Sequence, residues 1–150
     1  MDPTVVSHGI QLAVAPVFLL TAVAALIGSF ANRLARIVDR ARLLEEKLET
    51  ESIKNVRAAH WELKRLRLRG RIVSASMAML TICSLMIGIT IMALFLGETT
   101  QLNIQRWVPL SFIAGVIFFL LALLGFLVET LLAMHVLRFG RNLYADKKPN

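Results

Sequence analysis

Three apolar runs, each long enough to cross a lipid bilayer, constrain the fold of this chain more than any other feature. They lie at residues 10–31, 72–96 and 108–137 of a 150-residue sequence. A transmembrane helix needs about 20 predominantly apolar residues, and each run meets that length. Backbone polar groups inside a bilayer must be satisfied within the segment, which favours helices. The sequence therefore predicts an all-α membrane protein with three transmembrane helices in a single membrane domain.

Basic residues are distributed unevenly between the segments that connect these runs. Twelve of the seventeen Lys and Arg residues lie in residues 32–71, whereas the connection at residues 97–107 holds only Arg106 and the tail at 138–150 holds four. Basic loops stay on the cytoplasmic side of a membrane, so we expect the N-terminus outside and the C-terminus inside. The net charge of +7 then faces anionic lipid headgroups rather than nucleic acid. Six arginines are expected to fix this topology or meet headgroups: Arg40, Arg67, Arg69, Arg71, Arg138 and Arg141.

The arginine-rich connection at residues 32–71 has its own helical pattern. Apolar residues recur at steps of three and four on both sides of the polar stretch "ETESIKN", residues 49–55. We expect the first two transmembrane helices to continue into the cytoplasm and to pack as an antiparallel coiled-coil hairpin. The residues of this pattern are Leu34, Ile37, Ala41, Leu44 and Leu48 on the first arm and Val56, Ala59, Leu63, Leu66 and Gly70 on the second.

Acidic residues gather toward the tip of the predicted hairpin. They are Glu45, Glu46, Glu49 and Glu51. Such a run is ordinarily a solvated helix face. The alternative is a docking site for a cytoplasmic protein partner or a neighbouring subunit.

One long stretch resembles a known family. The segment "APVFLLTAVAALIGSFANRLARIVDRARLLE", residues 15–45, is similar to the signature of DUF2721, a family of small bacterial membrane proteins, and "RLARIVDRAR" is its most specific part. The resemblance implies a bacterial protein with about three spans in the inner (plasma) membrane. It carries no known activity and no assigned catalytic or binding residues.

The third apolar run contains one carboxylate, Glu129. A charge within a bilayer is unfavourable and ordinarily faces protein or water. We expect Glu129 to lie at headgroup level, paired with a basic residue such as Arg33 or Arg71. The alternative is a cation or proton site inside the membrane.

Small residues at helical spacing mark one face of the first and third runs. In membrane helices, small residues allow two backbones to approach closely. We expect these faces to meet protein, within one subunit or between subunits, although the same spacing arises by chance in Ala-rich helices. The predicted packing residues are Ala15, Ala22, Ala25, Gly115, Ala122 and Gly125.

The second run contains a soft-ligand pattern, with Met79, Cys83 and Met86 on one helix face. Thioether and thiolate groups bind Cu(I), and a three-span protein with its N-terminus outside resembles the Ctr copper transporters. The chain departs from them in having no Met-rich outer tail and no MxxxM in this run. Packing is the usual role of Met, so we expect no metal site and keep these three residues as a weak copper alternative.

The residues of catalytic chemistry are scattered. His8, His60 and His135 lie in three different regions, and no Gly-rich phosphate loop is present. We therefore expect no enzyme and no cofactor, but a homo-oligomeric membrane protein that acts by interaction or assembly. The alternative is an ion channel or small-solute transporter formed by the oligomer. Its candidate pore residues are Gln11, Ser29, Asn32, Arg33, Arg36 and Glu129.

Overall fold

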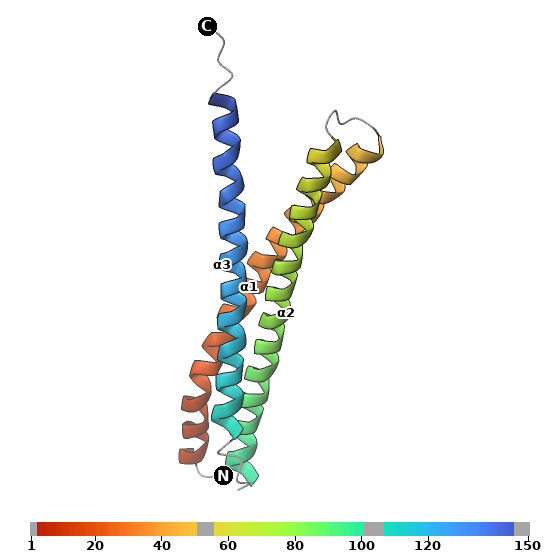
Figure 1. The fold of residues 1–150 in the computed structure, drawn as a ribbon. Helices are drawn as coiled ribbons and strands as arrows, with labels where there is room; N and C mark the ends of the chain where they lie inside the picture. The colour runs from red at the N-terminus through yellow and green to blue at the C-terminus, as the bar shows by residue number, and fades with distance from the viewer. Residues whose placement is uncertain (1–2, 51–55, 101–106, 146–150) are drawn as a thin grey trace.

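Three long helices account for the described part of the chain, which in this computed structural model comprises residues 3–50, 56–100 and 107–145. They are α1 (Pro3–Glu49), α2 (Val56–Thr100) and α3 (Trp107–Ala145) (Figure 1). The 47 residues of α1 extend over about 70 Å, more than twice the thickness of a bilayer core. An uninterrupted helix therefore runs from the apolar segment into the arginine-rich one, which contains neither Gly nor Pro between Ser29 and Glu49.

Helix boundaries differ from the boundaries of the apolar runs. The predicted outer connection began at residue 97, yet α2 continues to Thr100, and the predicted tail began at residue 138, yet α3 continues to Ala145. Hydropathy reports where a helix leaves the apolar phase, but a helix can continue in water as long as its backbone hydrogen bonds do. The ends of α1 and α2 flank the stretch expected to hold the turn, of which residues 51–55 lie outside the described part.

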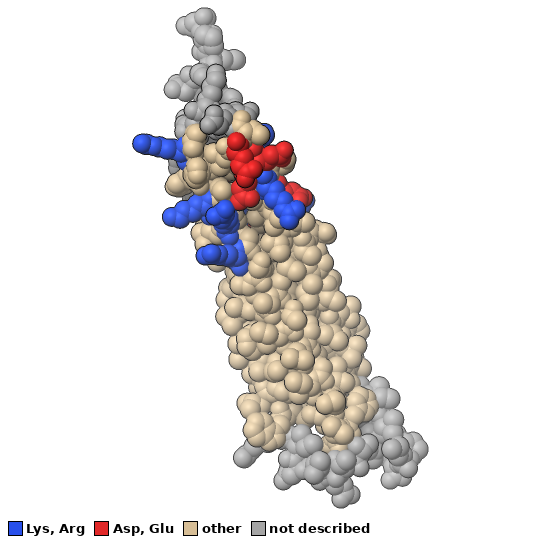
Figure 2. Space-filling view, turned by 90° about the vertical axis from the view of Figure 1, so that its right-hand side faces the viewer, with Lys and Arg blue, Asp and Glu red and all other residues tan. Residues whose placement is uncertain are grey.

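α2 is the central helix of the bundle. It packs along both α1, to which it is antiparallel, and α3, whereas α1 and α3 meet mainly where they cross (Figure 1). Beyond that crossing the C-terminal part of α3 diverges from the α1–α2 pair, so the molecule forks. Figure 2 shows that charged residues gather at the forked end, above a long surface free of charge.

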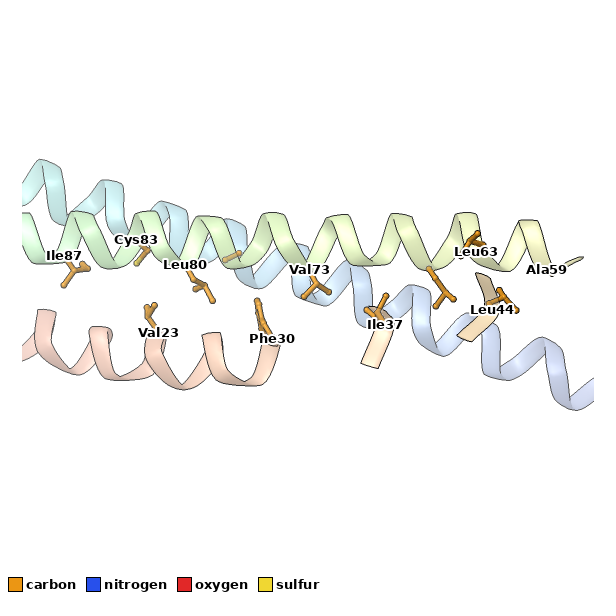
Figure 3. Close-up of a cluster of buried hydrophobic side chains, with 12 residues drawn as sticks. Val23, Phe30, Ile37, Leu44, Ala59, Leu63, Val73, Leu80, Cys83 and Ile87 are labelled. Atoms are coloured by element: carbon orange, nitrogen blue, oxygen red, sulfur yellow. The ribbon is translucent and has the colours of Figure 1, made fainter. Parts of the chain in front are cut away.

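The core follows a seven-residue spacing along α1 and α2. Val23, Phe30, Ile37 and Leu44 of α1 are buried and point toward α2 (Figure 3). Seven-residue steps keep one side chain in every two turns on the same side of a helix, which suits two helices packed at a shallow angle. The buried partners on α2 are Ala59, Leu63, Leu66, Val73, Leu80, Cys83 and Ile87. The hairpin pattern found in the sequence coincides with this core, except that Val56 is exposed.

The outer surface of the apolar segments is itself apolar. Phe18, Leu85 and Leu124 are among many large hydrophobic side chains that are more than half exposed. A protein folded in water rarely leaves such continuous apolar surface uncovered. All three helices contain a segment long and apolar enough to cross a membrane. The fold is therefore that of a protein solvated by lipid over much of its length.

Candidate functional site: a buried ion triad at the fork

Glu129 lies where the three helices converge, and its side chain is fully buried. Its Oε2 atom accepts a hydrogen bond from Nη1 of Arg33 on α1. Its Oε1 atom accepts two from Arg69 on α2, from Nη2 at 2.7 Å and from Nε at 3.1 Å. Both carboxylate oxygens are therefore held by guanidinium groups of the same chain, and one residue from each helix forms the triad.

Arg33 is fixed by further contacts on α3. Its Nη1 atom also donates a hydrogen bond to Oγ1 of Thr130 at 3.0 Å, and its guanidinium carbon lies 4.6 Å from the ring centre of Phe126. Phe126 in turn stacks on Phe30 of α1 at a centroid distance of 4.4 Å. Cation–π and aromatic stacking contacts of this kind add to the ion pair where water is excluded. This cluster supplies the main contact between α1 and α3.

The triad carries an excess of positive charge. Two guanidinium groups face one carboxylate, and the Arg33 and Arg69 side chains retain 32% and 23% exposure toward the fork. A buried carboxylate is tolerated only when it is paired and hydrogen-bonded, a condition that these two arginines meet. The remaining positive charge faces the space between the diverging helices.

That space is a cavity of about 340 Å³. Its polar lining consists of Arg33, Arg36, Arg40, Arg69 and Glu129. Its apolar lining consists of Ile37, Leu66 and Ala133. The cavity thus collects guanidinium groups from two helices directly beyond the predicted end of the first apolar run.

The pairing of Glu129 was only partly foreseen from the sequence. The expected pair with Arg33 is present, but Arg71 is exposed and Arg69 takes the second position. The sequence did contain a pattern that places Arg69 on the inward face of α2. Arg69 lies three residues after Leu66 and four before Val73, and both of these are buried. Arg71 lies on the opposite side of the helix. Thr130 and the Phe30–Phe126 stack were not expected.

Two of the arginines expected to fix the topology or to meet headgroups also form ion pairs between the arms of the hairpin. Arg40 donates to Oε1 of Glu62 at 3.0 Å, and Arg67 donates to Oε1 of Glu45 at 2.9 Å. Both pairs are exposed and bridge α1 to α2. Glu45 is thus part of a pair, whereas Glu46 and Glu49 are exposed. Glu51 and the side chains of Arg138 and Arg141 lie outside the described residues.

The small-residue face of α3 packs against α2. Gly115 and Ala122 are buried. A Cβ added at Gly115 would lie 3.0 Å from Cδ1 of Ile87, and one added at Gly125 would overlap Oγ of Ser76. Close by, Ser111 and Thr90 share a hydrogen bond of 2.8 Å between α3 and α2. The close contact between α3 and α2 on this face is possible because the glycines at positions 115 and 125 have no side chain.

The small-residue face of α1, in contrast, does not pack against α2 or α3 and is exposed. Ala15, Ala22, Ala25 and the polar residues Gln11, Ser29 and Asn32 are all exposed, as is Arg36 at its cytoplasmic continuation. The inward side of α1 is instead formed by Val23 and Phe30. The candidate pore set therefore divides. Glu129 and Arg33 belong to the interior of the bundle, Gln11, Ser29 and Asn32 lie on this outer face, and Arg36 is exposed but also lines the cavity at the fork.

The soft side chains of α2 occupy packing positions. Cys83 is fully buried in the core, Met79 packs against that core, and Cβ of Met86 would lie 3.4 Å from a Cβ added at Gly115. Within the described part of the chain, no three His, Cys, Asp or Glu side chains are grouped closely enough to hold a metal ion.

Three helices, each with an apolar segment of membrane length and linked by a buried ion triad where they converge, are the features of a multi-pass membrane protein. The chain belongs to the DUF2721 family, described as proteins of unknown function, whose family model matches residues 13–139. The match includes all three members of the triad. No curated protein and no solved structure shows significant similarity to the chain.

Proposed function

We propose that this protein acts without catalysis, by assembling with copies of itself in the membrane and presenting its hairpin at the cytoplasmic surface. The observation that carries the proposal is the uncovered face of α1. Gln11 and Ser29 lie within the first apolar run and are exposed, so they would face lipid in an isolated subunit. Polar side chains in that position are unfavourable unless they meet protein or water. A neighbouring subunit would satisfy them.

A second copy of this chain is the proposed occupant of that face. Small residues dominate it, including Ala22 and Ala25, and such residues allow the close helix approach that drives association in lipid. The chain's own α2 and α3 pack elsewhere, because the inward side of α1 is formed by Val23 and Phe30. Identical chains commonly assemble with cyclic symmetry, which would bring the α1 faces together around one axis.

Substitution on the α1 face tests the assembly. Replacing Ala22 and Ala25 together with Leu should convert the oligomer to smaller species, because the added side chains prevent backbone approach. Particle mass in a mild neutral detergent and cross-linking in native membranes are the measurements. Ala78→Leu, the same change at an exposed position of α2, is the matched control and should leave the mass unchanged. A wild-type protein that is monomeric in both assays would rule the proposal out.

The charge asymmetry supports an orientation with the hairpin in the cytoplasm of a bacterial cell and the protein in its inner membrane. Cysteine labelling checks it in a Cys83→Ala background. A cysteine at Lys54 should resist a membrane-impermeant maleimide in spheroplasts, while one at Gln101 should react. After permeabilisation both should react. The reverse pattern in spheroplasts would overturn the orientation.

A channel along the oligomer axis is the second candidate. It is supported by the alignment of Gln11, Ser29 and Arg36 on the same exposed face of α1. Glu129 does not contribute to it, since both its oxygens are bound inside the subunit. Salt flux from loaded liposomes separates the two candidates, because an assembly without a pore gives none.

A further inference from the structure

The cavity at the fork is rich in positive charge, and the proposed assembly of copies gives that charge no role. Four guanidinium groups line it, those of Arg33, Arg36, Arg40 and Arg69. Glu129 balances one of them and Glu62, paired with Arg40, balances another. Among the described residues, two positive charges therefore remain without a counter-charge around this cavity.

Arg36 is the group most available to a ligand. It is exposed, it lines the cavity, and it has no ion-pair partner among the described residues. Arg33 and Arg69 are held in place by Glu129, so their remaining N–H groups are positioned before any ligand arrives. Fixed guanidinium groups bind phosphate oxygens with strong, often bidentate hydrogen bonds.

We propose that this cavity binds a phosphate-bearing anion, either the headgroup of an anionic lipid or a soluble phosphate compound. Its volume of about 340 Å³ lies within the range of small-ligand sites. Arg33 follows the first apolar run by two residues and Arg69 precedes the second by three, which places the cavity at headgroup depth. Basic pockets between helices at this depth bind lipid phosphates. The side chains of Ile37, Leu66 and Ala133 provide an apolar wall beside the charges.

Binding can be measured by thermal unfolding of the full chain, purified and delipidated in a neutral detergent. The probes are short-chain phosphatidylglycerol, short-chain phosphatidylcholine and inorganic phosphate. Phosphatidylglycerol should raise the unfolding temperature in a saturable way, and phosphatidylcholine should not. If inorganic phosphate gives the same shift at similar concentration, the ligand is a soluble phosphate compound; if it gives none, the ligand is the lipid.

Arg36→Gln and Arg42→Gln form the matched pair of variants. Both remove one positive charge from an exposed position of α1, but only Arg36 lines the cavity. Arg36→Gln should weaken binding of the effective probe about tenfold, the value of one charge-assisted hydrogen bond, and Arg42→Gln less than about twofold. Equal weakening in both variants, equal shifts with both lipids, or no shift with any probe would overturn the proposal.

The test does not depend on assembly. Particle mass is recorded on the same samples, so a monomeric protein that still binds the probe through Arg36 would refute the proposed assembly and support the site. The lipid arm rests on the proposed membrane placement, whereas the phosphate arm does not.

Discussion

Replacing Glu129 with Ala should destabilise the protein by about 3–5 kcal/mol, the cost of removing one partner from a buried ion pair. The substitution leaves Arg33 and Arg69 close together without their shared counter-ion, and both are less than one-third exposed. It also frees α3 from its main link to α1. Equilibrium unfolding in mixed detergent micelles gives the free energy of unfolding directly.

Glu62→Ala is the control for this experiment. Glu62 also pairs with an arginine across two helices, but that pair is largely exposed, with side-chain exposures of 60% for Arg40 and 46% for Glu62. Exposed pairs contribute about 0–1 kcal/mol. Equal losses in Glu129→Ala and Glu62→Ala would show that burial of the triad has no structural role.

A triple variant separates the cost of unpaired charge from the contribution of the triad itself. Replacing Arg33, Arg69 and Glu129 together with Met removes all three charges while retaining much of the volume. Apolar replacement of a complete buried ion network is commonly neutral or stabilising. The triple variant should therefore unfold at a free energy near that of the wild type, well above that of Glu129→Ala.

Gly125→Leu is expected to produce the second large effect. Overpacking should lower the free energy of unfolding by about 1–3 kcal/mol. Even a Cβ at this position would overlap Oγ of Ser76, whose hydroxyl donates to the Ile72 carbonyl oxygen. A leucine therefore displaces the Ser76 hydroxyl and overpacks the contact between α3 and α2. Thermal unfolding in detergent measures the loss. Gly88→Leu is the control, because nothing lies within 4 Å of a Cβ added there.

A double-mutant cycle locates the overlap. In Gly125→Ala the added methyl group overlaps the Ser76 hydroxyl. When Ser76→Ala is also present, the hydroxyl is gone and the nearest atom is Cβ of residue 76 at 3.6 Å, which is an ordinary contact. The double variant should therefore be more stable than the sum of the single effects predicts, by about 0.5–3 kcal/mol. Strict additivity would contradict the proposed close contact at Gly125.

The inward face of the hairpin could be predicted from the sequence because it depends on local periodicity. Ile37, Leu44, Leu63 and Leu66 recur at helical spacing, and all four are buried between α1 and α2. The three membrane-length helices follow in the same way from the length of the apolar runs. Neither feature requires knowledge of which helix lies beside which.

The partners of the polar residues could not be predicted in this way. Arg33 and Glu129 are 96 residues apart, and Arg69 and Glu129 are 60 apart. Which arginine reaches the carboxylate depends on the rotation of α2 about its axis, and that rotation directs Arg69 inward and Arg71 outward. Charge count alone treats these two arginines as equivalent.

The small-residue faces show the same difference between what spacing can identify and what only the fold decides. Spacing identified a face on α1 and a face on α3, but spacing cannot say what each face meets. In the folded chain Gly115 and Gly125 pack on α2, while Ala22 and Ala25 are exposed.

Hydropathy and periodicity in the sequence by themselves determined that this protein is helical, that three segments can cross a membrane and which side of the hairpin is buried. These are properties of neighbouring residues on one helix. The tertiary structure alone decided that α2 is central, that Glu129 is shared by Arg33 and Arg69, and that a cavity lined by arginines opens at the fork. Those properties depend on the relative rotation and crossing of helices far apart in the chain, which packing of the whole bundle sets.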